Sequence, residues 1–168
     1  MPRPSSSVWA VLVGGTVPGM RLEVHDLLFA VGETIDDCTP SLRAQWRGEP
    51  AGLHRDAWGR LDAADGREVA LSDAAPDGPR LWFVHTGGYD TGRFAELHDN
   101  HFVVASDRDE AKRRAVARHA AWTLPHKDAL LDVDAVVDLT DTVPGRHLVP
   151  GRHTGAEFAF VADYVPIG

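Results

Sequence analysis

The sequence has little of several features that would restrict its function at once. It contains one cysteine, Cys38, together with two methionines and two tyrosines. A lone cysteine cannot form an intramolecular disulfide, and no neighbouring group favours its thiolate, so we expect Cys38 to be a small buried apolar residue. No apolar run approaches the roughly 18 residues of a membrane span, and residues 1–7 lack the apolar stretch of a secretory signal. We therefore expect a cytoplasmic protein without a membrane partner.

Positive charge is also in short supply. The chain has 17 Lys and Arg residues against 25 Asp and Glu, which gives a formal net charge of -8. This balance opposes attraction to a phosphate backbone, so nucleic acid is not an expected partner. The one basic cluster, Lys112-Arg113-Arg114, falls in a predicted amphipathic helix and is interpreted as a solvated helix face. Hydrophobic residues make up 43% of the sequence, as is ordinary for a globular protein.

The common catalytic signatures are missing as well. The glycines from Gly14 onward follow the order Gly-Gly-x-x-x-Gly, which is not the dinucleotide-binding order. No P-loop, Gly-x-Ser-x-Gly elbow, HExxH motif or paired CxxC motif occurs. What the chain does contain is an internal repeat. The stretch GGTVPGMRLEVHDLLF, Gly14 to Phe29, returns as GGYDTGRFAELHDNHF, Gly87 to Phe102.

The repeat extends on both sides of this stretch without a gap. Identical residues recur at one constant spacing: Trp9 with Trp82, Val11 with Val84, Gly14 with Gly87, Gly15 with Gly88, Gly19 with Gly92, Glu23 with Glu96, His25 with His98, Asp26 with Asp99, Phe29 with Phe102, Val31 with Val104 and Asp36 with Asp109. At a slightly different spacing, the sequence HRDA at 54–57 matches HKDA at 126–129. The pattern predicts a tandem duplication of a small α/β unit, since such a period is too long for a solenoid repeat.

The predicted fold class is α+β, with one helix per repeat packed on a short-stranded mixed or antiparallel sheet. Each unit is expected to run strand, loop, strand, helix, strand. The predicted boundaries are repeat 1 at 8–71, a Pro- and Gly-rich linker at 72–80, repeat 2 at 81–143, and a C-terminal loop with a closing strand at 144–168.

The individual elements follow from periodicity and turn residues. Strands are predicted at 8–13, 22–32, 81–86, 101–106, 133–139 and 157–165, and helices at 33–47 and 107–122. Gly14-Gly15 is expected to end the first strand, and Pro40 to delay or kink the first helix. Residues 53–56 and 144–153 are expected to be loops, with His147 and His153 exposed to solvent. Asp65-Gly66 predicts a tight hairpin.

The polar residues of the repeat form the candidate site. In an extended strand Glu23 and His25 point to one face and Asp26 to the other, while His54 and Asp56 share a face. The two glycines before the motif leave room for main-chain N–H groups to approach a ligand. The candidate ligand-binding residues are Glu23, His25, Asp26, His54, Asp56, Glu96, His98, Asp99, His126 and Asp128, with Gly14, Gly15, Gly87 and Gly88.

Four interpretations of these residues stay open. They can brace the fold of a purely structural or partner-binding protein through satisfied hydrogen bonds, or line a pocket for a small polar ligand. Imidazoles of His25, His54, His98 and His126, with nearby carboxylates, are also suitable ligands for a divalent metal. Finally, His25 or His98 can serve as a general base in a metal-assisted or histidine-based hydrolase or lyase. No cofactor is evident otherwise, and the sequence does not define an enzyme class or an oligomeric state.

The motifs as a set resemble a known family. A Gly-Gly-x-x-x-Gly turn followed by Glu-x-His-Asp, Phe-x-Val, a helix and His-x-Asp is similar to domain of unknown function 1543, an uncharacterised and mainly bacterial family. The resemblance covers 8–71 and 81–139, and members hold one or two copies of the domain. The second copy departs after its helix, where Asp65-Gly66 has no clear partner. The resemblance implies the architecture and no established activity.

Overall fold

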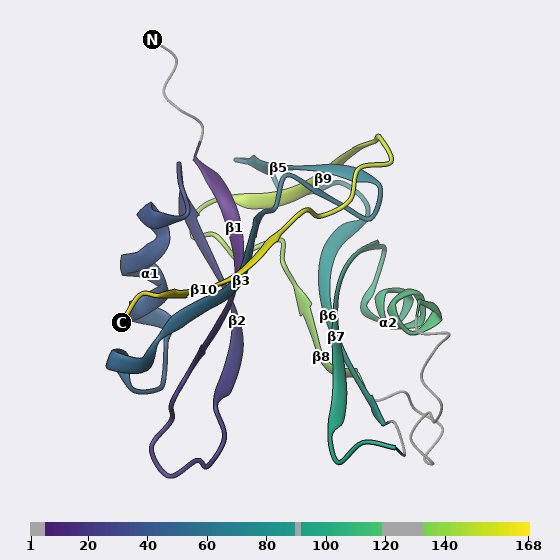
Figure 1. Cartoon of the computed structure of the whole chain (residues 1–168). Helices are drawn as coiled ribbons and strands as arrows, with labels where there is room; N and C mark the ends of the chain where they lie inside the picture. Colours follow the sequence, from purple (N-terminus) through teal and green to yellow (C-terminus); the bar gives the residue numbers. More distant parts are fainter. Residues whose placement is uncertain (1–5, 90–91, 119–132) are drawn as a thin grey trace. The chain divides into compact units, whose positions relative to one another are not determined.

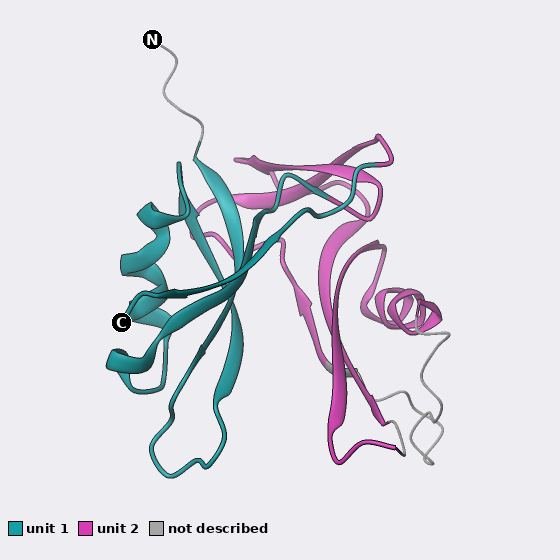
Figure 2. Ribbon diagram, in the orientation of Figure 1, with its two compact units in different colours: residues 1–63, 156–168 teal, residues 64–155 magenta. Residues whose placement is uncertain are grey.

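The chain forms two compact units in the computed structural model, which describes residues 6–89, 92–118 and 133–168. Unit 1 comprises Met1–Ala63 with Ala156–Gly168, and unit 2 comprises Ala64–Gly155 (Figure 2). The sheets are built from antiparallel strand pairs and accompanied by short helices, so the α+β class is confirmed. Among the described residues no helix is long and apolar enough to cross a membrane.

The sheet of unit 1 has the strand order β10-β3-β1-β2 (Figure 1). Its strands are β1 (Ser7–Gly15), β2 (Val24–Gly32), β3 (His54–Arg60) and β10 (Val161–Pro166), and each neighbouring pair is antiparallel. The apolar run VWAVLV forms the central part of β1, as predicted for a strand buried on both faces. β1 then continues through Gly14-Gly15, so the expectation that these glycines end the strand is wrong. Both glycines keep their pairing with β2.

One face of this sheet is covered by helical turns. A 3₁₀ turn, η1 (Asp36–Cys38), leads into α1 (Thr39–Gln45), and a second turn, η2 (Pro50–Gly52), precedes β3. Pro40 lies in the first turn of α1, where a missing N–H costs nothing, so the predicted late start is confirmed. The buried cluster beneath contains Val11, Val13, Leu28, Ala30, Cys38, Leu42, Leu53 and Ile167.

The predicted loop at 53–56 is wrong, because β3 begins at His54. The charged sequence His-Arg-Asp conceals a strand whose backbone pairs with β1 on one side and β10 on the other. The loop between β1 and β2 turns at Pro18-Gly19. Gly19 has a φ of 85°, and the N–H of Met20 donates to the carbonyl of Val17 at 3.0 Å.

Unit 2 contains a sheet of order β7-β6-β8, formed by β6 (Arg80–Tyr89), β7 (Glu96–Ala105) and β8 (Val133–Asp138). Helix α2 (Arg108–Ala117) packs on it through Ala111 and Ala115. It starts where predicted, because the Asp107 side chain caps it by accepting the N–H of Glu110 at 2.8 Å. The end of the predicted helix, 119–122, lies outside the described residues. The strand predicted from Val133 is confirmed as β8.

A small sheet completes unit 2 with the order β4-β5-β9: β4 (Ala63–Ala64), β5 (Arg67–Ser72) and β9 (His147–His153). Asp65 and Gly66 have φ of 53° and 74°, the left-handed pair of a tight hairpin, as predicted. The expected loop at 144–153 is wrong, since β9 pairs with β5. β9 also places His147 Nδ1 at 2.7 Å from Asp141 Oδ1. The closing strand β10 begins later than predicted, after Phe158 and Phe160.

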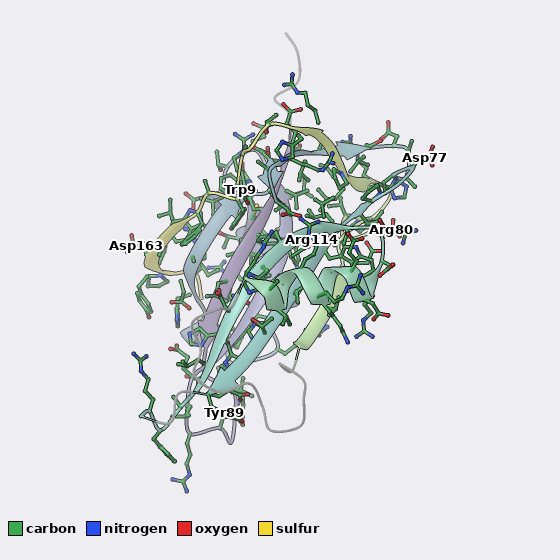
Figure 3. All side chains as sticks on the ribbon, turned by 90° about the vertical axis from the view of Figure 1, so that its right-hand side faces the viewer. Trp9, Asp77, Arg80, Tyr89, Arg114 and Asp163 are labelled. Atoms are coloured by element: carbon green, nitrogen blue, oxygen red, sulfur yellow. The ribbon has the colours of Figure 1, made fainter. Side chains whose placement is uncertain are left out.

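Asp65 has a second role beyond its turn. Its carboxylate accepts the N–H of Val104 at 2.7 Å and pairs with Arg114 and Arg118 of the helix side. Figure 3 shows Arg114 on α2, where its guanidinium also donates to the carbonyl of Val104. The basic cluster at 112–114 is therefore a solvated helix face only in part, because Arg114 ties the helix to the hairpin.

The central strands β1 and β6 have corresponding neighbours. Gly14 pairs with His25 in β2, and Gly87 pairs with His98 in β7. The register against the third strand shifts between Leu12 and Val13 in unit 1, and between the equivalent positions His85 and Thr86 in unit 2. The pairing of β1 with β3 and the pairing of β6 with β8 are therefore irregular at corresponding positions.

The register of β8 against β6 indicates which residues of unit 2 correspond to β3 of unit 1. Val13 pairs with Arg55, and its counterpart Thr86 pairs with Val133. The strand therefore aligns 133–135, with the sequence Val-Asp-Ala, to Arg-Asp-Ala at 55–57. This differs from the sequence match with 126–129. His126 and Asp128 lie outside the described residues.

Candidate metal centre

Strand register brings four of the predicted residues together on the face of the unit 1 sheet opposite α1. Gly14 pairs with His25 on one side and with His54 on the other, so the two histidines flank one glycine. Asp56 falls at the bulge of β3, between the partners of Leu12 and Val13. The bulge turns its carboxylate toward the same place. Glu23 directly precedes β2 and reaches the cluster from the end of the loop.

The four side chains alternate between imidazole and carboxylate. His54 Nε2 lies 3.2 Å from Glu23 Oε1 and 3.4 Å from Asp56 Oδ1. His25 Nε2 lies 3.4 Å from Asp56 Oδ2 and 3.8 Å from Glu23 Oε2. Each imidazole thus faces both carboxylates, and each carboxylate faces both imidazoles. This mutual arrangement concentrates two nitrogen and several oxygen donors around one point.

His54 is held in a defined orientation. Its side chain is 3% exposed, its Nδ1 lies 2.9 Å from the carbonyl oxygen of Gly52, and the Tyr164 ring lies 4.4 Å from its own ring. A carbonyl only accepts hydrogen bonds, so Nδ1 carries a proton and a neutral ring presents a lone pair at Nε2. That lone pair faces two carboxylate oxygens. The arrangement is repulsive unless a proton or a cation lies between them.

Gly14 forms the floor of the cluster. A Cβ at this position would lie 2.7 Å from Asp56 Oδ2, 2.7 Å from His54 Nε2 and 2.9 Å from His25 Cδ2. All three contacts are shorter than real Cβ atoms make. The polar atoms therefore sit directly over the Gly14 backbone, and a side chain there would occupy their place. The glycine is required by the cluster, since no left-handed φ is involved.

The cluster is closed on one side and open on the other. His54 is buried, while the side chains of Glu23 and His25 are 48% and 47% exposed. Asp56 is intermediate at 26%, but its Oδ2 atom is buried and has no hydrogen-bond partner among the described residues. A buried carboxylate oxygen without a donor is costly, which indicates that a proton or an ion completes it.

Other candidate residues of the first copy lie outside the cluster. The side chain of Asp26 accepts the N–H of Leu27 at 2.8 Å, in keeping with its prediction on the other face. Gly15 faces α1, where a Cβ would lie 2.9 Å from the Trp46 ring. Cys38 is fully buried as expected, and desolvation raises the pKa of its thiol to about 11.

The second copy forms a different arrangement. Glu96 Oε2 lies 3.6 Å from His98 Nε2, and the His98 ring stacks on His85 with centroids 4.8 Å apart. Asp99 accepts the N–H of Asn100 at 2.8 Å, as Asp26 does for Leu27. Gly87 and Gly88 lie within β6. Within the part of the chain that the structure describes, a group of three metal-ligating side chains occurs only at Glu23, His25 and His54.

Two contributors to the site could not be identified from the sequence. The Gly52 carbonyl and the Tyr164 ring reach His54 from η2 and β10, and β10 pairs with β3 from the far end of the chain. Gly52 has no identical counterpart in the second copy, and Tyr164 lies outside both copies. His85 was missed for a similar reason, because it stands where the first copy has Leu12, so the comparison between copies gave it no signal.

The segment that contains the Glu-x-His-Asp motif of the first copy is similar to a known family. Residues 20–71 match the family described as Domain of Unknown Function (DUF1543). The match contains all four residues of the cluster and confirms the resemblance that the Glu-x-His-Asp motif indicated for this segment. The family description assigns no activity.

A solved structure is similar over nearly the whole chain. It is described as the crystal structure of a protein Il1583 from Idiomarina loihiensis, with 27% sequence identity and a TM-score of 0.72. The similarity covers 98% of this chain and 99% of that one. No curated protein matches the chain.

Proposed function

We propose that unit 1 is an ion-binding module that holds a divalent transition-metal ion between Glu23, His25 and His54, with Asp56 beside them. The observation that carries the proposal is the orientation of His54. Its Nδ1 is committed to the Gly52 carbonyl, which leaves the Nε2 lone pair among carboxylate oxygens. A backbone carbonyl that accepts a hydrogen bond from the other ring nitrogen, and so fixes the tautomer, is typical of histidines that bind metals.

The spacing of the donor atoms supports the same proposal. Zinc–nitrogen and zinc–oxygen bonds of about 2.0–2.2 Å place neighbouring tetrahedral ligands about 3.3–3.5 Å apart. The donor atoms of Glu23, His25 and His54 all lie within 4.8 Å of one another, and Nε2 of His54 lies 3.2 Å from Oε1 of Glu23. Imidazole and carboxylate ligands suit zinc, manganese, cobalt and iron. The donor set is thus compatible with an ion of this class without rearrangement of the backbone.

The main competing interpretation is a structural brace. In that case a second proton on His54 bridges Nε2 to Glu23 or Asp56, and the cluster stabilises the sheet without binding an ion. Both interpretations predict that loss of His54 destabilises the protein. Only the metal interpretation predicts that an added ion raises the stability of the wild type, because a ligand bound to the native state stabilises it by mass action.

We also infer that the chain arose by tandem duplication and that, within the described residues, this ion site is specific to the first copy. The matched registers of β1 with β2 and β6 with β7 support the duplication. So does the pair of indole hydrogen bonds from Trp9 to Gly32 and from Trp82 to Ala105. Among the described residues, a group of three metal-ligating side chains is found in the first copy alone.

The experiment is equilibrium dialysis of metal-free protein against zinc or cobalt, followed by elemental analysis. We expect one ion per chain in the wild type, and a loss of affinity of about 100-fold or more in His54→Ala. Two variants are matched controls. Asp26→Asn changes the neighbouring residue of the same motif, and His98→Ala removes the equivalent histidine of unit 2. Both should bind one ion with wild-type affinity.

Two results would contradict the proposal. One is wild-type protein that takes up no ion and whose melting temperature does not change with zinc, cobalt or manganese; this would favour the brace. The other is equal loss of binding in His98→Ala and His54→Ala, which would place the ion elsewhere.

A further inference from the structure

We infer that the ion keeps one coordination position open to solvent, and that this position takes an oxygen atom of a small anionic ligand such as a carboxylate or a hydroxamate. The inference rests on the proposed ion site. It assigns that site to the class that exchanges ligands, in contrast to metal sites that only hold a fold together.

The uneven burial of the donors is the first argument. Structural zinc sites are closed by four protein ligands, while sites that act on ligands keep a position free. Here His54 is 3% exposed and its ring is covered by Tyr164, but Glu23 and His25 are about half exposed. An ion anchored on the buried His54 would be reached by solvent from the side of Glu23 and His25.

The composition of the donor set is the second argument. The donor atoms of Glu23, His25 and His54 lie within 4.8 Å of one another, and Asp56 is not part of that group. Two imidazoles and one carboxylate form a three-ligand set that is typical of sites with a free position. Such a set compensates only one of the two positive charges of the ion. An anionic oxygen is therefore a better additional ligand than a neutral one.

Asp56 then has a role of its own. Its Oδ1 and Oδ2 each lie 3.4 Å from one imidazole nitrogen, and Oδ2 is buried without a hydrogen-bond partner among the described residues. A carboxylate in this position repels an incoming anion and competes with it for the ion. Removal of its charge should consequently strengthen anion binding, whereas removal of a required ligand would weaken ion binding.

The test uses cobalt-loaded full-length protein and its visible absorption spectrum, which reports the number and type of cobalt ligands. Acetohydroxamate is the probe, and acetate is a weaker second probe. We expect the cobalt bands to change and saturate with added acetohydroxamate. We expect Asp56→Asn to retain cobalt and to bind the probe roughly tenfold more tightly, while Asp26→Asn behaves as the wild type.

The outcomes separate the two levels of the proposal. Cobalt bound with a spectrum that acetohydroxamate does not alter means a closed, structural ion site, and the inference fails while the ion site stands. Loss of cobalt from Asp56→Asn, with circular dichroism unchanged, makes Asp56 a required ligand and also overturns the open position. Absence of cobalt binding in the wild type removes both the ion site and the inference.

Discussion

Substitution of Gly14 by alanine tests the site through its floor and leaves every proposed ligand in place. The added Cβ would lie 2.7 Å from His54 Nε2 and from Asp56 Oδ2, and 2.9 Å from His25 Cδ2. Ordinary carbon contacts with nitrogen or oxygen need about 3.4 Å or more, so each group must retreat by about 0.5–0.7 Å. His54 is buried and tied to Gly52, and it has little room to do so.

The expected effect on the ion is larger than the effect on the fold. Metal sites tolerate changes in ligand distance of about 0.2 Å, so displacements of this size should weaken ion binding by about 100-fold or more. Overpacking costs about 1–3 kcal/mol, and replacing a strand glycine by alanine recovers about 0.5–1 kcal/mol. We therefore expect a net loss of about 1–2 kcal/mol in the free energy of unfolding without the ion.

The assay is titration calorimetry with zinc, together with urea unfolding of the metal-free protein. Gly151→Ala is the matched control, because its Cβ would meet Glu68 at an ordinary distance of 3.5 Å. Wild-type zinc affinity in Gly14→Ala would refute the reasoning, since it would mean that the ion does not use the groups above Gly14. Equal effects of both substitutions would point to a general loss of stability.

Three further predictions concern groups outside the site. Desolvation raises the folded-state pKa of the Cys38 thiol to about 11 from 9.0. The contribution of this thiol to the free energy of unfolding is therefore present below pH 9 and lost as the pH rises toward 11. Ellman's reagent at pH 8 should label the thiol only in urea. Asp65→Ala should lower the free energy of unfolding by about 3 kcal/mol in urea titrations, since it strands the buried N–H of Val104 and puts alanine at a φ of 53°. Hydrogen bonds from the backbone N–H of Thr34 and, second, from its hydroxyl lower the pKa of Asp37. The stabilisation of the fold by this carboxylate is present above its ordinary pKa of 3.8 and is lost as the pH falls through the lowered folded-state pKa. Thr34→Val should move the NMR titration of Asp37 back toward 3.8.

The sequence predicted those parts of the fold that local chemistry determines. The apolar run of β1, the Pro40 start of α1, the Asp107 start of α2 and the Asp65-Gly66 turn each follow from short-range preferences. Strands made of polar residues were missed. β9 lies in the stretch PGRHLVPGRH at 144–153, whose two Pro-Gly pairs are typical of a loop, and it is a strand because β5 supplies its partner.

For the candidate site, the sequence predicted the residues but not how they come together. Internal repetition singled out Glu23 and His25, and the spacing of His54 and Asp56 put both on one face of an extended segment. Their convergence depends on three strands in register, on a bulge at Asp56 and on a glycine floor, none of which has a local signal. After the helix the register aligns 133–135 with 55–57, while the sequence match at 126–129 lies outside the described residues.

The most direct test of the ion site is a crystal structure of the zinc-soaked protein with data collected on both sides of the zinc absorption edge. The account predicts one strong anomalous peak in unit 1, within about 2.0–2.2 Å of Nε2 of His25 and Nε2 of His54 and of an oxygen of Glu23. A cluster without an anomalous peak, with His54 hydrogen-bonded directly to Glu23 or Asp56, would contradict it and make the cluster a brace of the sheet.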